Sequence, residues 1–229
     1  MLRETFQQEL DGLISDVAAF GAEVEGSLKN TVVAMEARDA DVARQELGVD
    51  ARYKARGMDI ERGCMLLQAH QAPVARDLRL LYTVQSVTNH LVRSGTLTEH
   101  ICQVIAETAD SERDEDLESA LVEMARAARN IFSEGLDIFR NHDVERARDL
   151  QAKDDKVDLL YSEAMNLIAN PSGDGGAPEW RMKAALMVHY LERISDHGVG
   201  IGGSTVFLVT GERIEDAMQH YTERELGEE

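Results

Sequence analysis

The chain has 229 residues, and its hydrophobic content of 43% is enough to bury a sizeable core. It carries 24 basic against 43 acidic residues, and a formal charge of −19 repels the phosphate backbone of nucleic acids and anionic lipid head groups. We therefore expect no direct binding to nucleic acid.

The first half of the chain contains the pattern of three helices. Only three prolines occur and aromatic residues make up 5%, which favours helices over β-structure. From Phe6 to Met35 the apolar residues alternate in steps of three and four, and this spacing predicts one long amphipathic helix. A polar break at 38–41 precedes a second helix that ends near Ala69. We expect 71–73 to open a third helix, which ends near Thr108, because proline suits a first turn.

The second half repeats this organisation. An acidic connector at 111–116 precedes a fourth helix, which is broken at 141–143, and a fifth helix ends near Ala169. The segment 170–178 is rich in glycine and proline and is the clearest loop of the chain. A sixth helix follows, and its stretch 198–203 holds four glycines, for which either fraying or close helix packing is expected.

Internal similarity relates the two halves. Asp39–Arg44 reads like Asp143–Arg148, and Leu91–Thr96 reads like Leu191–Asp196, which gives a period of about a hundred residues. The sequence therefore predicts an all-α fold of six long helices, arranged as two tandem three-helix bundles with pseudo-twofold symmetry. The expected units are a first repeat at 1–109, a second repeat at 110–210 and an acidic C-terminal tail at 211–229.

No segment of the sequence predicts export or insertion into a membrane. No stretch approaches 18 consecutive apolar residues, and the first ten residues are too polar for a secretory signal. Cys64 and Cys102 lack metal-type spacing, and one pair of cysteines is no disulfide framework. We expect a cytoplasmic protein.

Two pairs of carboxylates are the strongest candidates for a binding site. Asp154 and Asp158 lie four residues apart on the fifth helix, and Glu192 and Asp196 lie four apart on the sixth, so each pair shares one helix face. Like charges at this spacing repel by a few tenths of a kcal/mol, and a cation bound between the helices would reverse that effect. Four carboxylates from two helices would make a site for a hard cation.

A second interpretation of these carboxylates stays open. In a chain with 43 acidic residues, carboxylates four apart also arise by chance on solvated faces. His189 and His197 lie within one turn of the carboxylate face and could join it, although a single helical histidine is more often structural. Neither a Glu-x-x-His di-iron motif nor a nucleotide-binding or hydrolase motif is present, so we do not expect an enzyme.

Two motifs resemble a known family. The segment Gln71–Arg79 is similar to the one that opens the third helix in PhoU proteins, and Tyr190–His197 resembles the family motif Leu-Glu-Arg-Ile-Gly-Asp-His. With the duplication and the Asp154–Asp158 segment, the resemblance covers roughly residues 5 to 210.

The resemblance implies a function as well as a fold. PhoU proteins are two three-helix bundles whose Glu/Asp-x-x-x-Asp motifs hold iron or zinc, and they are negative regulators of phosphate uptake and phosphate-starvation signalling. Their partners are a phosphate ABC transporter and a sensor histidine kinase, so the protein would lie at the cytoplasmic face of the membrane through a partner. The candidate metal ligands carried over by position are Asp154, Asp158, Glu192 and Asp196. Arg193 is expected to be a structural ion-pair partner.

The first repeat departs from the family's metal motif. Lys54 stands where the second repeat has Asp158, Val92 where it has Glu192, and Thr96 where it has Asp196, so only Asp50 remains. A lysine removes a ligand and repels a cation, so iron or zinc is expected in the second repeat only. The alternative is a helical scaffold, or a regulator of persistence or polyphosphate metabolism, without a functional metal site. Long amphipathic helices also make a homodimer plausible.

Overall fold

The computed structural model describes residues 2–71, 73–171 and 176–212, and within them the regular structure is entirely helical. The predicted all-α fold with six long helices is confirmed, and a seventh, short helix accompanies them. The helices are α1 (Leu2–Ala37), α2 (Ala40–Gln45), α3 (Val49–Gln71), α4 (Ala75–Glu107), α5 (Glu115–Asn141), α6 (Val144–Ala169) and α7 (Pro178–Thr210). Part of the expected 170–178 loop and the tail from 213 onward lie outside the described residues. Among the described helices, none is long and apolar enough to cross a bilayer.

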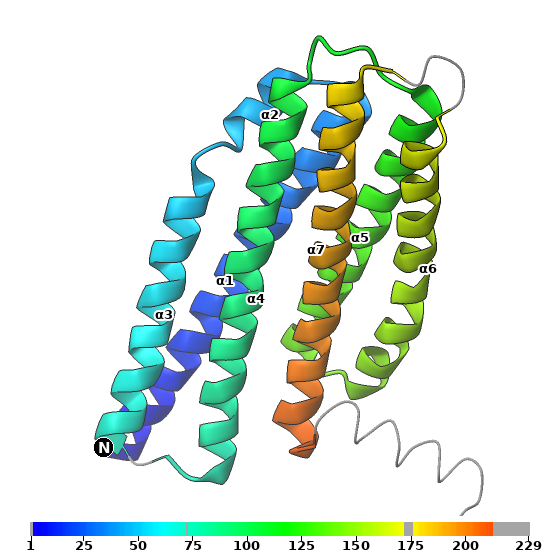
Figure 1. Cartoon of the computed structure of the whole chain (residues 1–229). Coiled ribbons are helices and arrows are strands. Elements are labelled where there is room, and N and C mark those ends of the chain that lie inside the picture. The colour runs from blue at the N-terminus through cyan, green and yellow to red at the C-terminus, as the bar shows by residue number, and fades with distance from the viewer. Residues whose placement is uncertain (1, 72, 172–175, 213–229) are drawn as a thin grey trace, which may run out of the picture.

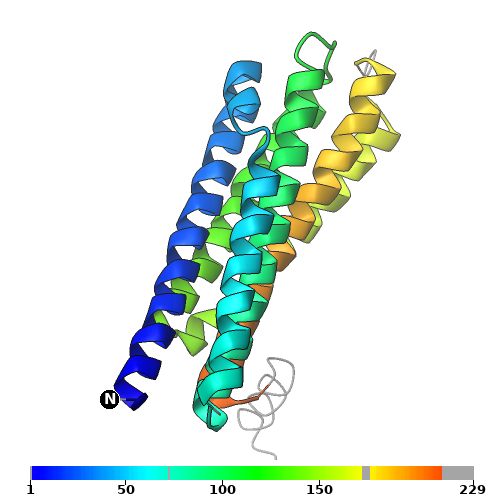
Figure 2. The ribbon, with the colours of Figure 1, turned by 90° about the vertical axis from the view of Figure 1, so that its left-hand side faces the viewer.

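The helices form two bundles that lie side by side (Figure 1). One contains α1, α3 and α4, and the other contains α5, α6 and α7, with α4 packed on α7 and α1 packed on α5. Figure 2 shows from a second side that the long helices run along the length of an elongated molecule. Because α4 and α7 run in opposite directions, the two bundles are related by a pseudo-twofold axis across the long direction.

The duplication is visible in the turns that follow α1 and α5. Arg38 and His142 both adopt the left-handed conformation, each with φ 54°. The next residue in each copy, Asp39 or Asp143, accepts hydrogen bonds from backbone N–H groups of the following helix, at 2.9 and 3.1 Å in the first copy and 3.1 Å in the second. An aspartate at this position satisfies donors that a helix start leaves free. The matching sequence segments therefore build the same turn twice.

The second predicted helix is divided into α2 and α3. The chain turns at Gly48, whose φ of 86° favours glycine. The carboxylate of Glu99, on α4, accepts hydrogen bonds from the backbone N–H groups of Gly48 at 3.0 Å and Asp50 at 2.7 Å, and so caps the start of α3. In the second repeat, α6 continues without this break.

The third predicted helix begins later than expected. Gln71 still belongs to α3, and α4 begins at Ala75 with Val74 as its cap residue. Pro73 therefore lies in the link between the two helices rather than in the first turn of α4. Proline has no N–H group with which to continue α3, so it separates the helices.

The glycine-rich stretch of α7 packs closely against α5. A Cβ atom on Gly135 would lie 2.3 Å from the carbonyl oxygen of Gly198, and one on Gly198 would lie 2.8 Å from the Cα of Phe132. Since α7 remains helical to Thr210, close packing rather than fraying explains these glycines.

Aromatic and glycine positions alternate across the contact between α4 and α7. His90 of α4 lies over Gly200, where an added Cβ would be 2.4 Å from the imidazole. Ten residues further along α4, His100 packs against Tyr190 with ring centroids 5.4 Å apart. His90 and Tyr190 are one repeat period apart, and so are His100 and Gly200. The His90–Gly200 contact therefore corresponds to the Tyr190–His100 contact, as a pseudo-twofold axis through the middle of α4 and α7 requires.

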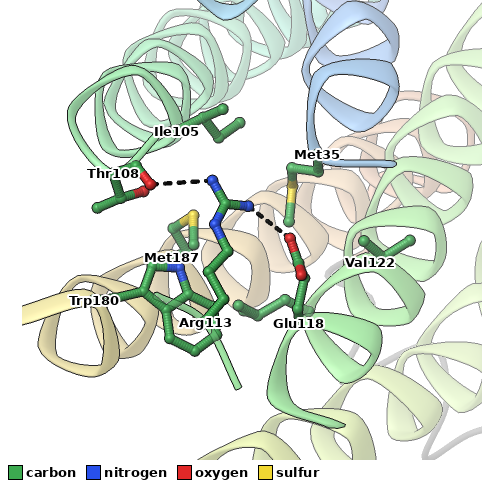
Figure 3. Close-up of a pocket in the computed structure, with 9 residues that line it drawn as sticks. Met35, Ile105, Thr108, Arg113, Glu118, Val122, Trp180 and Met187 are labelled. Carbon is green, nitrogen blue, oxygen red and sulfur yellow. Dashed lines mark hydrogen bonds and ion pairs between the residues drawn. The ribbon is translucent and has the colours of Figure 1, made fainter. Parts of the chain in front are cut away.

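A buried ion pair joins the two repeats at the link between α4 and α5 (Figure 3). The Arg113 guanidinium donates to the Glu118 carboxylate at 2.6 Å and to the carbonyl oxygen of Thr108 at 3.2 Å, next to Trp180. The second carboxylate oxygen of Glu118 pairs with Arg38. This one carboxylate therefore connects the end of the α1 segment to the start of α5.

Candidate metal site on α6 and α7

Asp154 is the most constrained of the four predicted ligands. It is half-buried on α6, and its Oδ1 accepts a hydrogen bond of 2.5 Å from the hydroxyl of Ser195 on α7. Burial raises the pKa of Asp154, the Ser195 hydrogen bond partly offsets this rise, and the charges of Asp196 and Asp158 add to it. The ionised form of Asp154 is thus disfavoured by its own surroundings.

Asp196 experiences the same repulsion from the other helix. Burial raises its pKa most, and the charges of Glu192 and Asp158 raise it further, while Arg193 and His189 act in the opposite direction. Glu192 has His189 as its neighbour, with its Oε2 3.6 Å from the imidazole Nδ1. The α6–α7 packing therefore brings the four predicted carboxylates into mutual electrostatic contact.

The four side chains do not converge on one point. Within the part of the chain that the structure describes, no group of three or more histidine, cysteine, aspartate or glutamate side chains is arranged to hold a metal ion. Carboxylate oxygens from two adjacent helices suit iron or zinc as donor chemistry. One oxygen of Asp154 accepts a hydrogen bond from Ser195, which leaves its other oxygen for a cation.

Two neighbours of these carboxylates have other surroundings than the sequence predicted. Among the described residues, no carboxylate lies within ion-pair distance of Arg193, although its charge opposes the rise in the pKa of Asp196. His197 turns towards the first repeat, with its Nδ1 3.2 Å from the Nδ1 of His90 on α4. Of the two histidines near the carboxylate face, only His189 adjoins it.

The equivalent position in the first repeat contains an internal ion pair. The Lys54 ammonium lies 2.6 Å from the Asp50 carboxylate, and the Thr96 hydroxyl donates to the same carboxylate at 2.5 Å. Burial alone would raise the pKa of Asp50, but the hydrogen bonds from Lys54 and Thr96 outweigh it and leave the pKa lowered. A lysine side chain thus supplies the positive charge beside Asp50.

His90 is a residue of this region that the sequence did not predict. The repeat could not reveal it, because the residue one period later is Tyr190 and not a histidine. The available signal was the antiparallel register of α4 and α7, which places His90 opposite His197 once the pseudo-twofold axis is known.

The comparisons with known proteins agree with this architecture. A family model described as the PhoU domain matches two segments of the chain, residues 17–105 and 121–205. The chain belongs to the PhoU family. These two matches fall on the two bundles, so the duplication found in the sequence is the duplication of the PhoU domain.

PhoU relatives match over nearly their whole length. A PhoU homologue of Clostridium acetobutylicum is 26% identical over 217 residues, which cover 94% of this chain and 99% of that protein. PhoU of Escherichia coli is 26% identical over 208 residues, covering 90% and 86%. Both are described as accessory proteins of the phosphate-specific transport system. The crystal structure of PhoU from Pseudomonas aeruginosa has a TM-score of 0.83 at 23% identity, covers 90% of this chain and 100% of that one, and so shares the fold.

Proposed function

We propose that this protein is a non-catalytic accessory regulator of phosphate transport. In this proposal it restrains phosphate uptake and phosphate-starvation signalling by contact with a phosphate ABC transporter or a sensor histidine kinase at the cytoplasmic face of the membrane. The observation that carries the proposal is the match of both repeats to the PhoU domain, together with the 99% coverage of a relative described as a transport accessory protein.

The chemistry at the α6–α7 site supports regulation rather than catalysis. The hydroxyl of Ser195, which donates a hydrogen bond to the carboxylate of Asp154, is 1% exposed. A nucleophile needs access to its substrate, and this hydroxyl has none. The carboxylates themselves are suited to binding a cation or a basic partner.

The function is tested in the organism that encodes the chain. The gene is deleted, and uptake of radiolabelled phosphate is measured in phosphate excess, with and without a plasmid copy. Uptake should continue in the deletion strain and fall when the wild-type chain is restored. Uptake that is the same in all three strains would overturn the proposal and favour the scaffold or another regulated process.

We further propose that iron or zinc binds to Asp154, Asp158, Glu192 and Asp196 of the second repeat. The support is that burial and neighbouring carboxylate charges raise the pKa values of Asp154 and Asp196, an effect that a bound cation would offset. The first repeat already has the Lys54 ammonium in the corresponding place, so it is not expected to bind metal.

Elemental analysis of purified protein tests the metal site. After reconstitution with iron, zinc or manganese, Asp158→Asn and Glu192→Gln should lose bound metal, while Lys54→Ala should retain the wild-type content. A wild-type chain that stays metal-free, or equal loss in all three variants, would refute the site. Sedimentation of the same preparations tests the homodimer, which the proposal also includes.

A further inference from the structure

A groove of about 450 Å³ runs along the outer contact between α1 and α3. Figure 2 views the molecule from the side on which these two helices lie, α1 in blue and α3 in cyan. We call it the α1–α3 groove, and its walls include Glu9, Gly12, Leu13 and Asp16 from α1 and Gly63 and Leu66 from α3. The groove belongs to the first repeat and is separate from the candidate metal site on α6 and α7.

Two glycines shape the groove. A Cβ atom on Gly63 would lie 2.7 Å from Cδ2 of Leu13, so this leucine rests directly against the backbone of α3 and forms an apolar floor. Apart from its chain neighbours and the backbone of its own helix, a Cβ atom on Gly12 would meet nothing within 4 Å among the described residues. The space beside Gly12 is therefore open, next to a floor that is apolar.

The second repeat differs from the first at the positions that form the groove. In the alignment of α3 with α6 used above, Gly63 corresponds to Leu167, and Leu66 corresponds to Asn170. Leu167 is partly buried against the core, so the second repeat has a bulky side chain at the position of Gly63. Leu66 is 51% exposed, whereas Asn170 is the residue that ends α6. The first repeat thus has more space and more exposed apolar surface here.

Two carboxylates border the groove without a basic partner. Among the described residues, no lysine or arginine lies within ion-pair distance of Glu9 or Asp16, although His70 also lines the groove. Arg56 pairs with the carboxylate of Glu23 and donates to the backbone carbonyl oxygen of Asp16 at 3.4 Å. The chain as a whole carries a charge of −19, so the surroundings add to the negative potential of the groove.

The spacing of these carboxylates favours a helix over a metal ion. Glu9 and Asp16 are seven residues apart, which is about 10 Å along a helix, too far for one cation to contact both. Two basic side chains seven residues apart on another helix have the same spacing and can lie beside both carboxylates. An amphipathic helix also supplies the apolar stripe that covers an apolar groove.

Charge disfavours two other occupants of the groove. The chain's own tail, 213–229, carries six acidic and two basic residues, so the two carboxylates of the groove repel it. A second copy of the chain brings the same excess of negative charge. The groove is therefore better suited to a basic segment of another protein.

We infer that the α1–α3 groove binds an amphipathic helix of a partner protein. Apolar side chains of that helix lie over Leu13 and Leu66. Two basic side chains seven residues apart lie beside Glu9 and Asp16. That the partner belongs to the phosphate transporter or the sensor kinase rests on the proposed function, whereas the preference for a basic amphipathic helix rests on the groove alone.

Fluorescence anisotropy of a labelled peptide tests the inference on the full chain. The probe, called the lysine peptide, is a helical peptide of about five turns with a leucine stripe and two lysines seven residues apart. Gly12→Leu fills the groove without a clash and should weaken binding of this peptide at least about tenfold. The matched control Gly26→Leu is also exposed on α1 with nothing near its added Cβ, lies outside the groove, and should bind like the wild type.

Substitutions at the rim separate the apolar part of the binding from the charged part. Leu66→Asn introduces the residue of the second repeat and should weaken binding about fivefold, whereas Leu159→Asn, at a 72% exposed position on α6, should have no effect. Glu9→Gln and Asp16→Asn should each weaken binding about two- to fivefold, and this loss should shrink in about 1 M salt. Urea unfolding verifies that each variant is folded.

The inference is overturned if the lysine peptide does not bind, if a peptide with glutamate at the two lysine positions binds as tightly, or if Gly26→Leu weakens binding as much as Gly12→Leu. It is also overturned if the wild type sediments as a dimer and Gly12→Leu as a monomer, because the occupant would then be a second copy. The uptake assay separates these outcomes from failure of the proposed function. A chain that restrains uptake but does not bind the lysine peptide refutes the groove alone, whereas unchanged uptake on deletion refutes the transport role even where the peptide binds.

Discussion

The contact between His90 and His197 should make the protein less stable in mild acid. The pKa of His197 falls from 6.5 to about 4, first because the ring is buried and then because His90 and two arginines oppose its charge. In the unfolded chain the same ring takes up a proton near its ordinary pKa of about 6.5. Between the two pKa values, the unfolded state binds more protons than the folded state. The contribution of His197 to the free energy of unfolding is therefore complete above pH 6.5 and is lost as the pH falls to about 4.

The magnitude follows from the shift in pKa. At 1.36 kcal/mol per unit, His197 alone would contribute about 3 kcal/mol to the free energy of unfolding at neutral pH, of which about 2 kcal/mol would be lost between pH 6.5 and 5. Urea unfolding of the wild type and of His197→Gln over this range measures the difference. Asp154 and Asp196 have raised pKa values, so their contribution to stability increases as the pH falls. Both residues are present in the wild type and in His197→Gln, so this contribution cancels in the difference between the two proteins. Parallel curves for the two proteins would refute the reasoning.

Four further substitutions test the packing, a helix cap and the buried ion pair. In urea unfolding, Gly135→Ala should destabilise the protein by about 1 to 3 kcal/mol, because the added methyl group would clash at the α5–α7 contact. The control Gly12→Ala faces open space on α1 and should stabilise the chain by up to about 1 kcal/mol. Equal effects of the two substitutions would contradict the close approach of α5 and α7. Glu99→Gln should cost about 1 kcal/mol and speed amide exchange in the first turn of α3, and unchanged exchange would show that the cap is unimportant. Glu118→Gln should lower the free energy of unfolding by about 3 kcal/mol, since it leaves Arg38 and Arg113 without their carboxylate. An unaltered melting temperature would argue against a stabilising role of the buried pair.

The long helices could be predicted because their causes are local. Steps of three and four place Val17, Phe20 and Val24 on one stripe, and all three are buried. The break between α2 and α3 could not be predicted in the same way. Gly48 lies in a polar stretch that is compatible with helix, and the carboxylate that caps α3 comes from Glu99, about fifty residues later in the chain.

The candidate site also combines features that are set within one helix and features that depend on packing between helices. Spacing within one helix placed Asp154 with Asp158 and Glu192 with Asp196, and the repeat identified Lys54 as a departure from the pattern. The hydroxyl that engages Asp154 and the imidazole that engages His197 both come from packing between helices. Periodicity assigns a residue to a face of its own helix, but the residue opposite depends on tertiary register.

The alternation of contacts between α4 and α7 has a consequence for how the two repeats diverged. His90 packs over Gly200, and His100 packs against Tyr190. The corresponding positions of the two repeats therefore carry side chains of different size. A chain made of two identical first repeats would bring His100 into the space that Gly200 leaves for His90. The second repeat therefore cannot be replaced by a copy of the first unless this contact repacks.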